Sequence, residues 1–312
     1  MRTLLWSSFM ECNTQPRTVH LGSCLICAPV LKVFEYRDRF EHVFGVQIRN
    51  YKIPPASHIP ILQPRNSKQV ENIRFKQLQS QRLSHDALYN LHEMAIDLPD
   101  FVHTIHTHPD LVCVLGWQAV LDEMDRVLLL NAPSPPLLSY DTTFQLGDFY
   151  TSVLCFRHTL FKEAPIIPAA FLLHERKFQS HHAELFSICR KLIKSLPSST
   201  NPIVTDEEKA IVNAITELLP RLPQLRCWNH IFRDVTRWLR SHGAPSHDVS
   251  IYLSDIRVLF HLLTEEEYKS TLAEMKCKWS APFSDYYTTN IHPDIHSIGQ
   301  WAIESYRVYD PS

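Results

Sequence analysis

The spacing of apolar and polar residues along the chain changes character near Leu128. Before that point, residues 67–125 carry apolar positions at helical spacing in a charged background, which predicts a helical region. After it come three apolar runs rich in β-branched and aromatic residues: LLLNAPSPPLLSYDTTFQL, DFYTSVLCFRHTL and APIIPAAFLLHE. Gly147 and Asp148 separate the first pair of runs, and residues 162–164 separate the second. Such short gaps favour antiparallel hairpins, so we expect a three-stranded meander.

Helices and single strands alternate after the meander. An amphipathic helix is predicted over residues 179–195, and a short strand at residues 203–204 leads into a helix that begins near Thr205. QLRCWNH predicts another strand and IFRDVTRWLRSH another helix. The order β-β-β-α-β-α-β-α is that of an RNase H-like mixed sheet, so the predicted fold class is α/β. Beyond Ala244 the pattern is nearly all helical, and a last helix is expected near Ile295–Tyr306.

Four regions follow from these patterns. Residues 1–66 are irregular, because closely spaced prolines exclude long helices there. Residues 67–125 are the helical region, and residues 126–243 are the RNase H-like core. Residues 244–312 are expected to be nearly all helical.

Composition and charge narrow the class of function. The chain has only 6 glycines and lacks the glycine-rich phosphate loops of nucleotide-binding folds. Its net charge of -2 means that a nucleic-acid partner would be held by local basic patches. The 8 cysteines are scattered, which favours free thiols in a reducing intracellular compartment. No apolar run approaches the roughly 20 residues that span a bilayer, so no membrane association is expected.

Two acidic residues stand out against apolar strands. Asp141 lies within the first strand of the meander, and Asp206 lies where the fourth strand meets the next helix. In the expected sheet these strands are neighbours, so the two carboxylates can converge and share Mg²⁺ or Mn²⁺. Metal ions held there would activate water for phosphodiester cleavage. Taken singly, Asp206 is better explained as an acid at a helix N-terminus, and Asp141 equally suits a turn or a strand edge.

A CxxH pair, Cys227 and His230, falls at the next junction of a strand with a helix. A thiol and an imidazole at this spacing can reach one ion, but zinc requires four ligands and only two are local. On chemistry alone, a buried thiol beside a histidine at a helix start is the simpler interpretation.

These residues belong to three motifs that resemble blocks of the Mutator-like element (MULE) transposases. The motifs are DTTF at residues 141–144, TDEEKAIVNAI at 205–215 and CWNH at 227–230, and the resemblance extends over about Leu128–His242. It implies a DDE transposase that cuts and joins DNA strands with divalent metal. It also implies that Asp141 and Asp206 are the first two metal-binding acids, and that Cys227 and His230 form the C-x-x-H signature of the family.

The resemblance also implies that residues 244–312 hold the all-helical insertion of the family and the start of a C-terminal part that is truncated. The third acid of that family follows the insertion, in a segment resembling N-x-x-E-x-x-N. The sequence to Ser312 has no such segment. We therefore expect this acid to have been lost through truncation, gene decay or a split gene model. Glu304 is a candidate by position alone.

Other side chains suggest further binding sites, for DNA and for zinc. Arg233, Arg237 and Arg240 share one face of the helix after CxxH and could hold DNA phosphates, with a solvated basic face as the alternative. In the N-terminal region, Cys24 and Cys27 suggest a remnant of a Zn²⁺-binding DNA-recognition module. The HxH at residues 106–108 and the aromatic segment 279–287 are more simply structural.

Three hypotheses follow. The first is a DDE-class nuclease and strand transferase that acts on double-stranded DNA in the nucleus, as a monomer or a homo-oligomer. The second is a domesticated or decayed transposase that only binds DNA or protein. The third is an intracellular scaffold without a site. Carboxylates of Asp141 and Asp206 on opposite faces of the sheet would contradict the transposase hypothesis.

Overall fold

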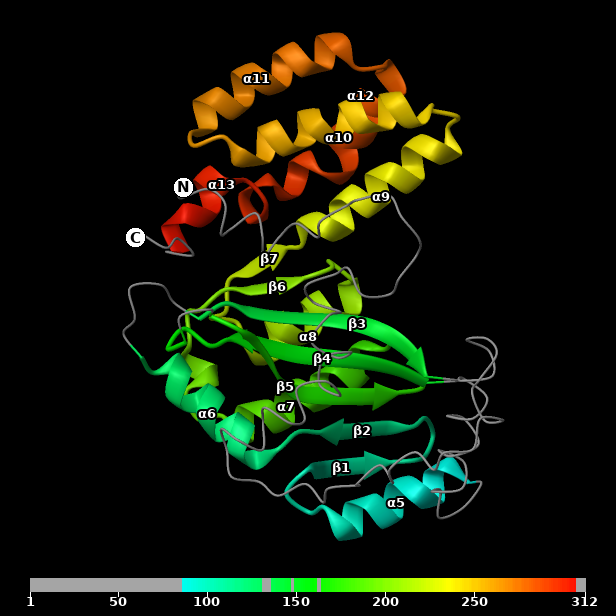
Figure 1. Ribbon diagram of the computed structural model, residues 1–312, viewed down its shortest axis with the longest axis vertical. Coiled ribbons are helices and arrows are strands. Elements are labelled where there is room, and N and C mark those ends of the chain that lie inside the picture. The colour runs from blue at the N-terminus through cyan, green and yellow to red at the C-terminus, as the bar shows by residue number, and fades with distance from the viewer. Residues whose placement is uncertain (1–85, 131–135, 147–148, 162–163, 307–312) are drawn as a thin grey trace, which may run out of the picture.

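The computed structural model describes residues 86–130, 136–146, 149–161 and 164–306 (Figure 1). Seven strands in this part form one mixed sheet in the order β1-β2-β5-β4-β3-β6-β7. β3, β4 and β5 are antiparallel neighbours, whereas β6 runs parallel to β3, and β7 parallel to β6. The predicted meander and the α/β class are confirmed. The strands span Val102–His106, Val112–Leu115, Leu138–Leu146, Phe149–Arg157, Ile166–His174, Ile203–Thr205 and Gln224–Arg226.

Helices cover both faces of this sheet. On one face pack α6, α7 and α8, and on the other α9 begins directly after β7 and leads into a helical region beyond that edge (Figure 1). The helices α5 to α12 span Ala87–Asp97, Gln118–Leu128, Gln179–Leu192, Lys209–Leu218, Trp228–Ser241, Ser246–His261, Glu265–Lys278 and Ala281–Asn290. Short helical turns are η2 (Leu196–Ser198), η3 (His292–Ser297), α13 (Gln300–Ile303) and η4 (Glu304–Tyr306).

Alternation along the strands divides the core in two. In β6, Ile203 packs with the core under α7 and α8, whereas the next residue, Val204, packs with α9 and the helical region. In β3, Tyr140 packs against Phe186 of α7, with ring centroids 4.9 Å apart. Successive side chains of a strand point to opposite faces, so Asp141 points towards α9.

A hairpin corrects the expectation that residues 67–125 are helical. Val102–His106 and Val112–Leu115 pair as β1 and β2, and β2 also pairs with β5. The apolar run VCVL is buried because β5 and the helices enclose it, and a short buried run of this kind has no periodicity that separates strand from helix. After it, Gly116 lies against the β5 backbone: an added Cβ would stand 2.7 Å from the Ala169 oxygen.

Predicted helix boundaries also differ. α9 already begins at Trp228, within the run QLRCWNH that was predicted as a strand. α8 begins at Lys209 rather than near Thr205, because Glu207 adopts a left-handed conformation, with φ 69, that interrupts the helix. Residues 295–306 form separate short turns rather than one helix, with extended backbone at Gly299 between η3 and α13. Among the described helices, none is both long and apolar enough to cross a membrane.

Candidate metal centre

Asp141 occupies the middle of the sheet. It lies in β3 between β4 and β6, and only 2% of its surface is exposed. A carboxylate in such a place is costly unless charged or hydrogen-bonding groups meet it.

Asp206 follows the last residue of the neighbouring strand, β6. In the parallel register Leu138 pairs with Ile203 and Ser139 with Val204, and the same offset sets Asp141 level with Asp206. Asp141 lies two residues after Ser139, and Asp206 lies two residues after its partner Val204. Side chains two residues apart in a strand share a face, so both acids point to the α9 face. Asp206 Oδ1 accepts a hydrogen bond of 3.0 Å from the amide of Glu208, which fixes the carboxylate over the turn into α8.

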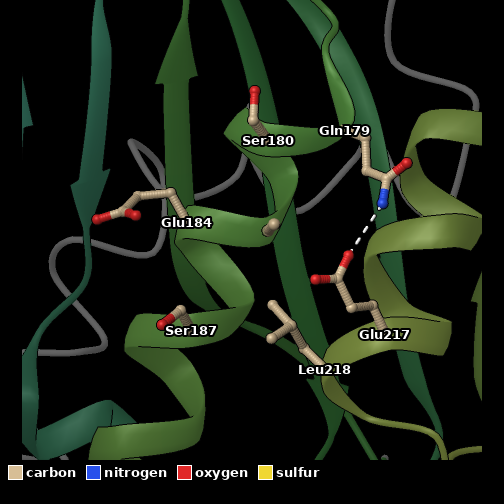
Figure 2. A pocket seen from close by; sticks show the side chains of 7 residues that line it. Gln179, Ser180, Glu184, Ser187, Glu217 and Leu218 are labelled. Carbon is tan, nitrogen blue, oxygen red and sulfur yellow. Dashed lines mark hydrogen bonds between the residues drawn. The ribbon is translucent and has the colours of Figure 1, made fainter.

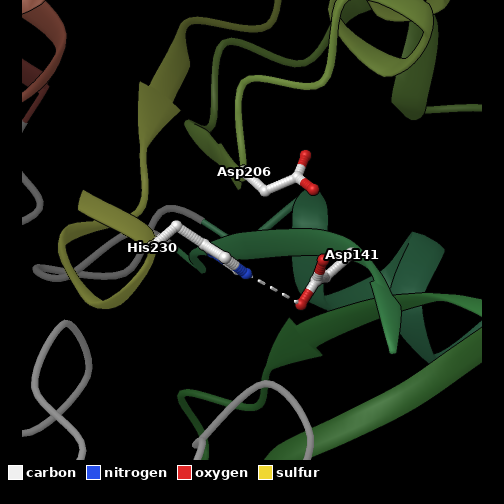
Figure 3. A group of neighbouring side chains, drawn as sticks. All are labelled: Asp141, Asp206 and His230. Atoms are coloured by element: carbon white, nitrogen blue, oxygen red, sulfur yellow. Dashed lines mark ion pairs between the residues drawn. The ribbon is translucent and has the colours of Figure 1, made fainter. Parts of the chain in front are cut away.

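His230 enters this site from the first turn of α9. Its Nε2 lies 3.6 Å from Oδ2 of Asp141, and its side chain is 9% exposed. One ligand atom each of Asp141, Asp206 and His230 can be chosen so that all lie within 4.8 Å of one another (Figure 3). The expectation that the two carboxylates converge is confirmed, and the histidine joins them.

The side chains of the CxxH pair lie in different environments. The Cys227 side chain is buried in the hydrophobic core formed with α9 and the helical region, whereas His230 faces the carboxylates. The Cys227 amide donates a 2.8 Å hydrogen bond to the carbonyl of Thr205, the residue before Asp206. This bond ties the start of α9 to the end of β6, and so sets His230 beside Asp206.

The chemistry of this group fits a divalent cation. Two carboxylates and an imidazole are ordinary ligands of such ions, and two acids this close repel each other unless a positive charge lies between them. The neighbouring Glu207 lies outside the group. Burial, together with a hydrogen bond to Asp294, raises the pKa of Glu207 to about 7, while Arg226 opposes the rise.

The remaining predicted residues lie apart from the group. Glu304 is exposed in η4 and is not among the three converging side chains. Arg233, Arg237 and Arg240 are exposed along α9, and Arg237 pairs with Asp234 of the same helix. The predicted zinc-binding remnant at Cys24 and Cys27 lies outside the described residues.

Several simpler interpretations are confirmed. Trp279, Phe283 and Tyr287 are buried in the core of the helical region. Cys113, Cys155 and Cys189 are free and buried, and burial raises the pKa of each thiol to about 12. These thiols are therefore packing residues rather than reactive groups.

A surface depression lies elsewhere, between α7 and α8 (Figure 2). It has a volume of about 440 Å³, and Gln179 donates a hydrogen bond to Glu217 across it. α7 and α8 cover the face of the sheet opposite Asp141, so this depression is separate from the candidate metal centre.

Sequence reasoning missed the partners of Arg226. Its guanidinium pairs with Glu207 and with Asp294, which are distant from each other in sequence. The sequence around an arginine at the end of a short strand does not indicate which acidic residues it will contact.

Comparison with known proteins agrees with this geometry. The family model of the MULE transposase domain matches residues 137–234. The matched segment runs from β3 into α9 and contains all three converging side chains, so the resemblance noted in the sequence is confirmed. No curated protein matches the chain.

Proposed function

We propose that the segment matched by the family model of the MULE transposase domain, residues 137–234, cuts and joins strands of double-stranded DNA with the help of divalent metal. The observation that carries the proposal is the convergence of Asp141, Asp206 and His230 within 4.8 Å. The strand order β5-β4-β3-β6-β7 supports an RNase H-like arrangement, with the acids on the central strand and its parallel neighbour.

Asp141 and Asp206 hold Mg²⁺ or Mn²⁺ in this proposal, and His230 supplies a third ligand from within the chain. Bound metal would activate the attacking water and stabilise the leaving oxygen. An imidazole suits softer transition metals better than Mg²⁺, so the group favours Mn²⁺ of the two ions. Burial of Asp141 and His230 limits the access of water to the ligands.

The reaction has two steps. In hydrolysis, the water oxygen bonds to phosphorus, a bridging P–O bond breaks, and the leaving oxygen takes up a proton to become a hydroxyl. In strand transfer, that hydroxyl attacks a phosphodiester of a second DNA and gives up its proton, and a bridging P–O bond of that DNA breaks. The substrate is chromosomal DNA in this proposal, which implies a nuclear location.

The arginine face of α9 supplies the contact to DNA. Arg237 follows His230 by about two helical turns, so both lie on one side of the helix. Arg233 and Arg240 both lie to one side of that line, turned from His230 by roughly 60° and 80°. All three arginines are exposed. We infer that this face holds the phosphates of a duplex whose scissile bond lies at His230.

The test combines a binding and a cleavage measurement. Asp141→Asn and Asp206→Asn are expected to abolish Mn²⁺ binding in calorimetry and Mn²⁺-dependent cleavage of supercoiled DNA. Asp285→Asn is the matched control, because Asp285 is exposed on α12, away from the converging side chains. A folded wild-type protein that binds no Mn²⁺ would contradict the proposal. Binding to DNA without cleavage at any Mn²⁺ concentration would favour a decayed transposase that acts as a binding module.

A further inference from the structure

The segment from Asn290 to Ile298 is bonded to both residues that flank Cys227. Nη1 of Arg226 donates a 2.8 Å hydrogen bond to the carbonyl of Asn290 and lies 3.0 Å from Oδ2 of Asp294. Nε1 of Trp228 donates a 2.9 Å hydrogen bond to the carbonyl of Ile298 in the buried core. The helical region is thus attached to the junction of β7 with α9, where the CxxH pair begins.

The same guanidinium reaches the turn that carries Asp206. Arg226 forms an ion pair with Glu207, the next residue after Asp206, and the Arg226 side chain is only 12% exposed. Glu207 has a φ of 69, a conformation that residues other than glycine keep only where surrounding contacts hold them. The adjoining hydrogen bond from the Glu208 amide to Asp206 Oδ1 depends on this conformation.

We propose that Arg226 is a positioning residue through which the helical region sets the place of the Asp206 carboxylate. The guanidinium is planar and presents its donors in a fixed fork, so its orientation towards Asp294 also fixes its orientation towards Glu207. Docking of residues 290–298 and assembly of the metal-binding turn are then one event. This inference rests on the proposed function for the role of Asp206, but the coupling itself is a property of the metal-free chain.

Asp294→Asn tests the coupling from the helical side, where Asp294 meets both Arg226 and Glu207. The substitution removes the charge that orients Arg226 from the helical side and leaves the Arg226–Glu207 pair in place. We expect Mn²⁺ affinity, measured by electron paramagnetic resonance of the free ion, to fall by about tenfold, as for other residues that orient metal ligands. We also expect faster amide exchange at residues 203–208 in metal-free protein. Arg226→Lys, which keeps the charge but loses the fork, should give the same two effects.

Asp285→Asn is the control within the same helical region, and it should change neither measurement. Unchanged Mn²⁺ affinity and unchanged exchange in Asp294→Asn would overturn the inference. If the wild-type protein binds no Mn²⁺, the proposed function fails, and amide exchange in the metal-free protein still decides the coupling. If Arg226→Lys does not fold, Asp294→Asn alone carries the test.

Discussion

At the scale of single residues, His230 adds an imidazole to the two carboxylates of the candidate metal centre. Its Nε2 lies 3.6 Å from Asp141, whereas the sequence alone does not separate its role from that of Cys227. We predict that His230→Gln weakens Mn²⁺ binding by about tenfold, or about 1.4 kcal/mol, and changes Mg²⁺ binding less, because it removes the softer ligand. Calorimetric titration with both ions measures this. His247→Gln, at an exposed position of α10, is the control, and equal losses for the two ions would show that His230 is not a ligand.

Two buried histidines on the opposite face of the sheet predict a pH dependence of stability. Burial lowers the pKa of His174 to about 4 and that of His182 to about 3, with smaller effects from His181 and Lys177. The unfolded chain therefore binds protons first as the pH falls below 6.5. The stability from their neutral forms is fully present above that pH and is lost as the pH falls towards the folded values.

The double variant His174→Gln, His182→Gln removes this dependence. We expect lower stability than wild type at neutral pH, because the bonds to Ser152 and Tyr140 are altered. Below about pH 6 its free energy of unfolding should fall less steeply, by up to about 1.4 kcal/mol per pH unit for each histidine. Urea unfolding at a series of pH values measures the slopes. Parallel slopes in both proteins would contradict the pKa assignments.

At the scale of elements, α9 joins the metal centre to an exposed basic face. We predict that replacing Arg233, Arg237 and Arg240 by Gln weakens duplex binding most at low salt. The slope of log affinity against log salt should fall by about 0.9 for each phosphate that the variant no longer neutralises. Fluorescence anisotropy with a labelled duplex measures it. Arg190→Gln, exposed on α7, is the control. A triple variant with the wild-type slope would place the DNA elsewhere.

The elements also show what the sequence could predict. Asp141 and Asp206 lie side by side because their strands are neighbours and because side chains alternate between the two faces of a strand. The apolar runs of the sequence predict both the strands and this alternation. The sequence does not predict the hairpin at residues 102–115. β2 forms a strand because it pairs with β5, about sixty residues later. Likewise, Arg226 meets Asp294 across 68 positions, and such a contact depends on how the helical region docks.

At the scale of the whole molecule, the candidate metal centre lies where the sheet meets the helical region, so metal binding should stabilise both. In metal-free protein, Asp141 and Asp206 repel each other, and Asp206→Asn should raise the melting temperature by relieving that repulsion. In wild type, Mn²⁺ at a hundredfold excess over Kd should add about 2.7 kcal/mol of stability, whereas the variant should gain far less. Thermal unfolding with and without Mn²⁺ should therefore reverse the order of the two proteins: the variant melts higher without the ion and lower with it.

Asp285→Asn should follow wild type under both conditions. An Asp206→Asn protein that melts below wild type in both conditions would mean that this carboxylate serves the fold, as the cap of the turn into α8, rather than a cation.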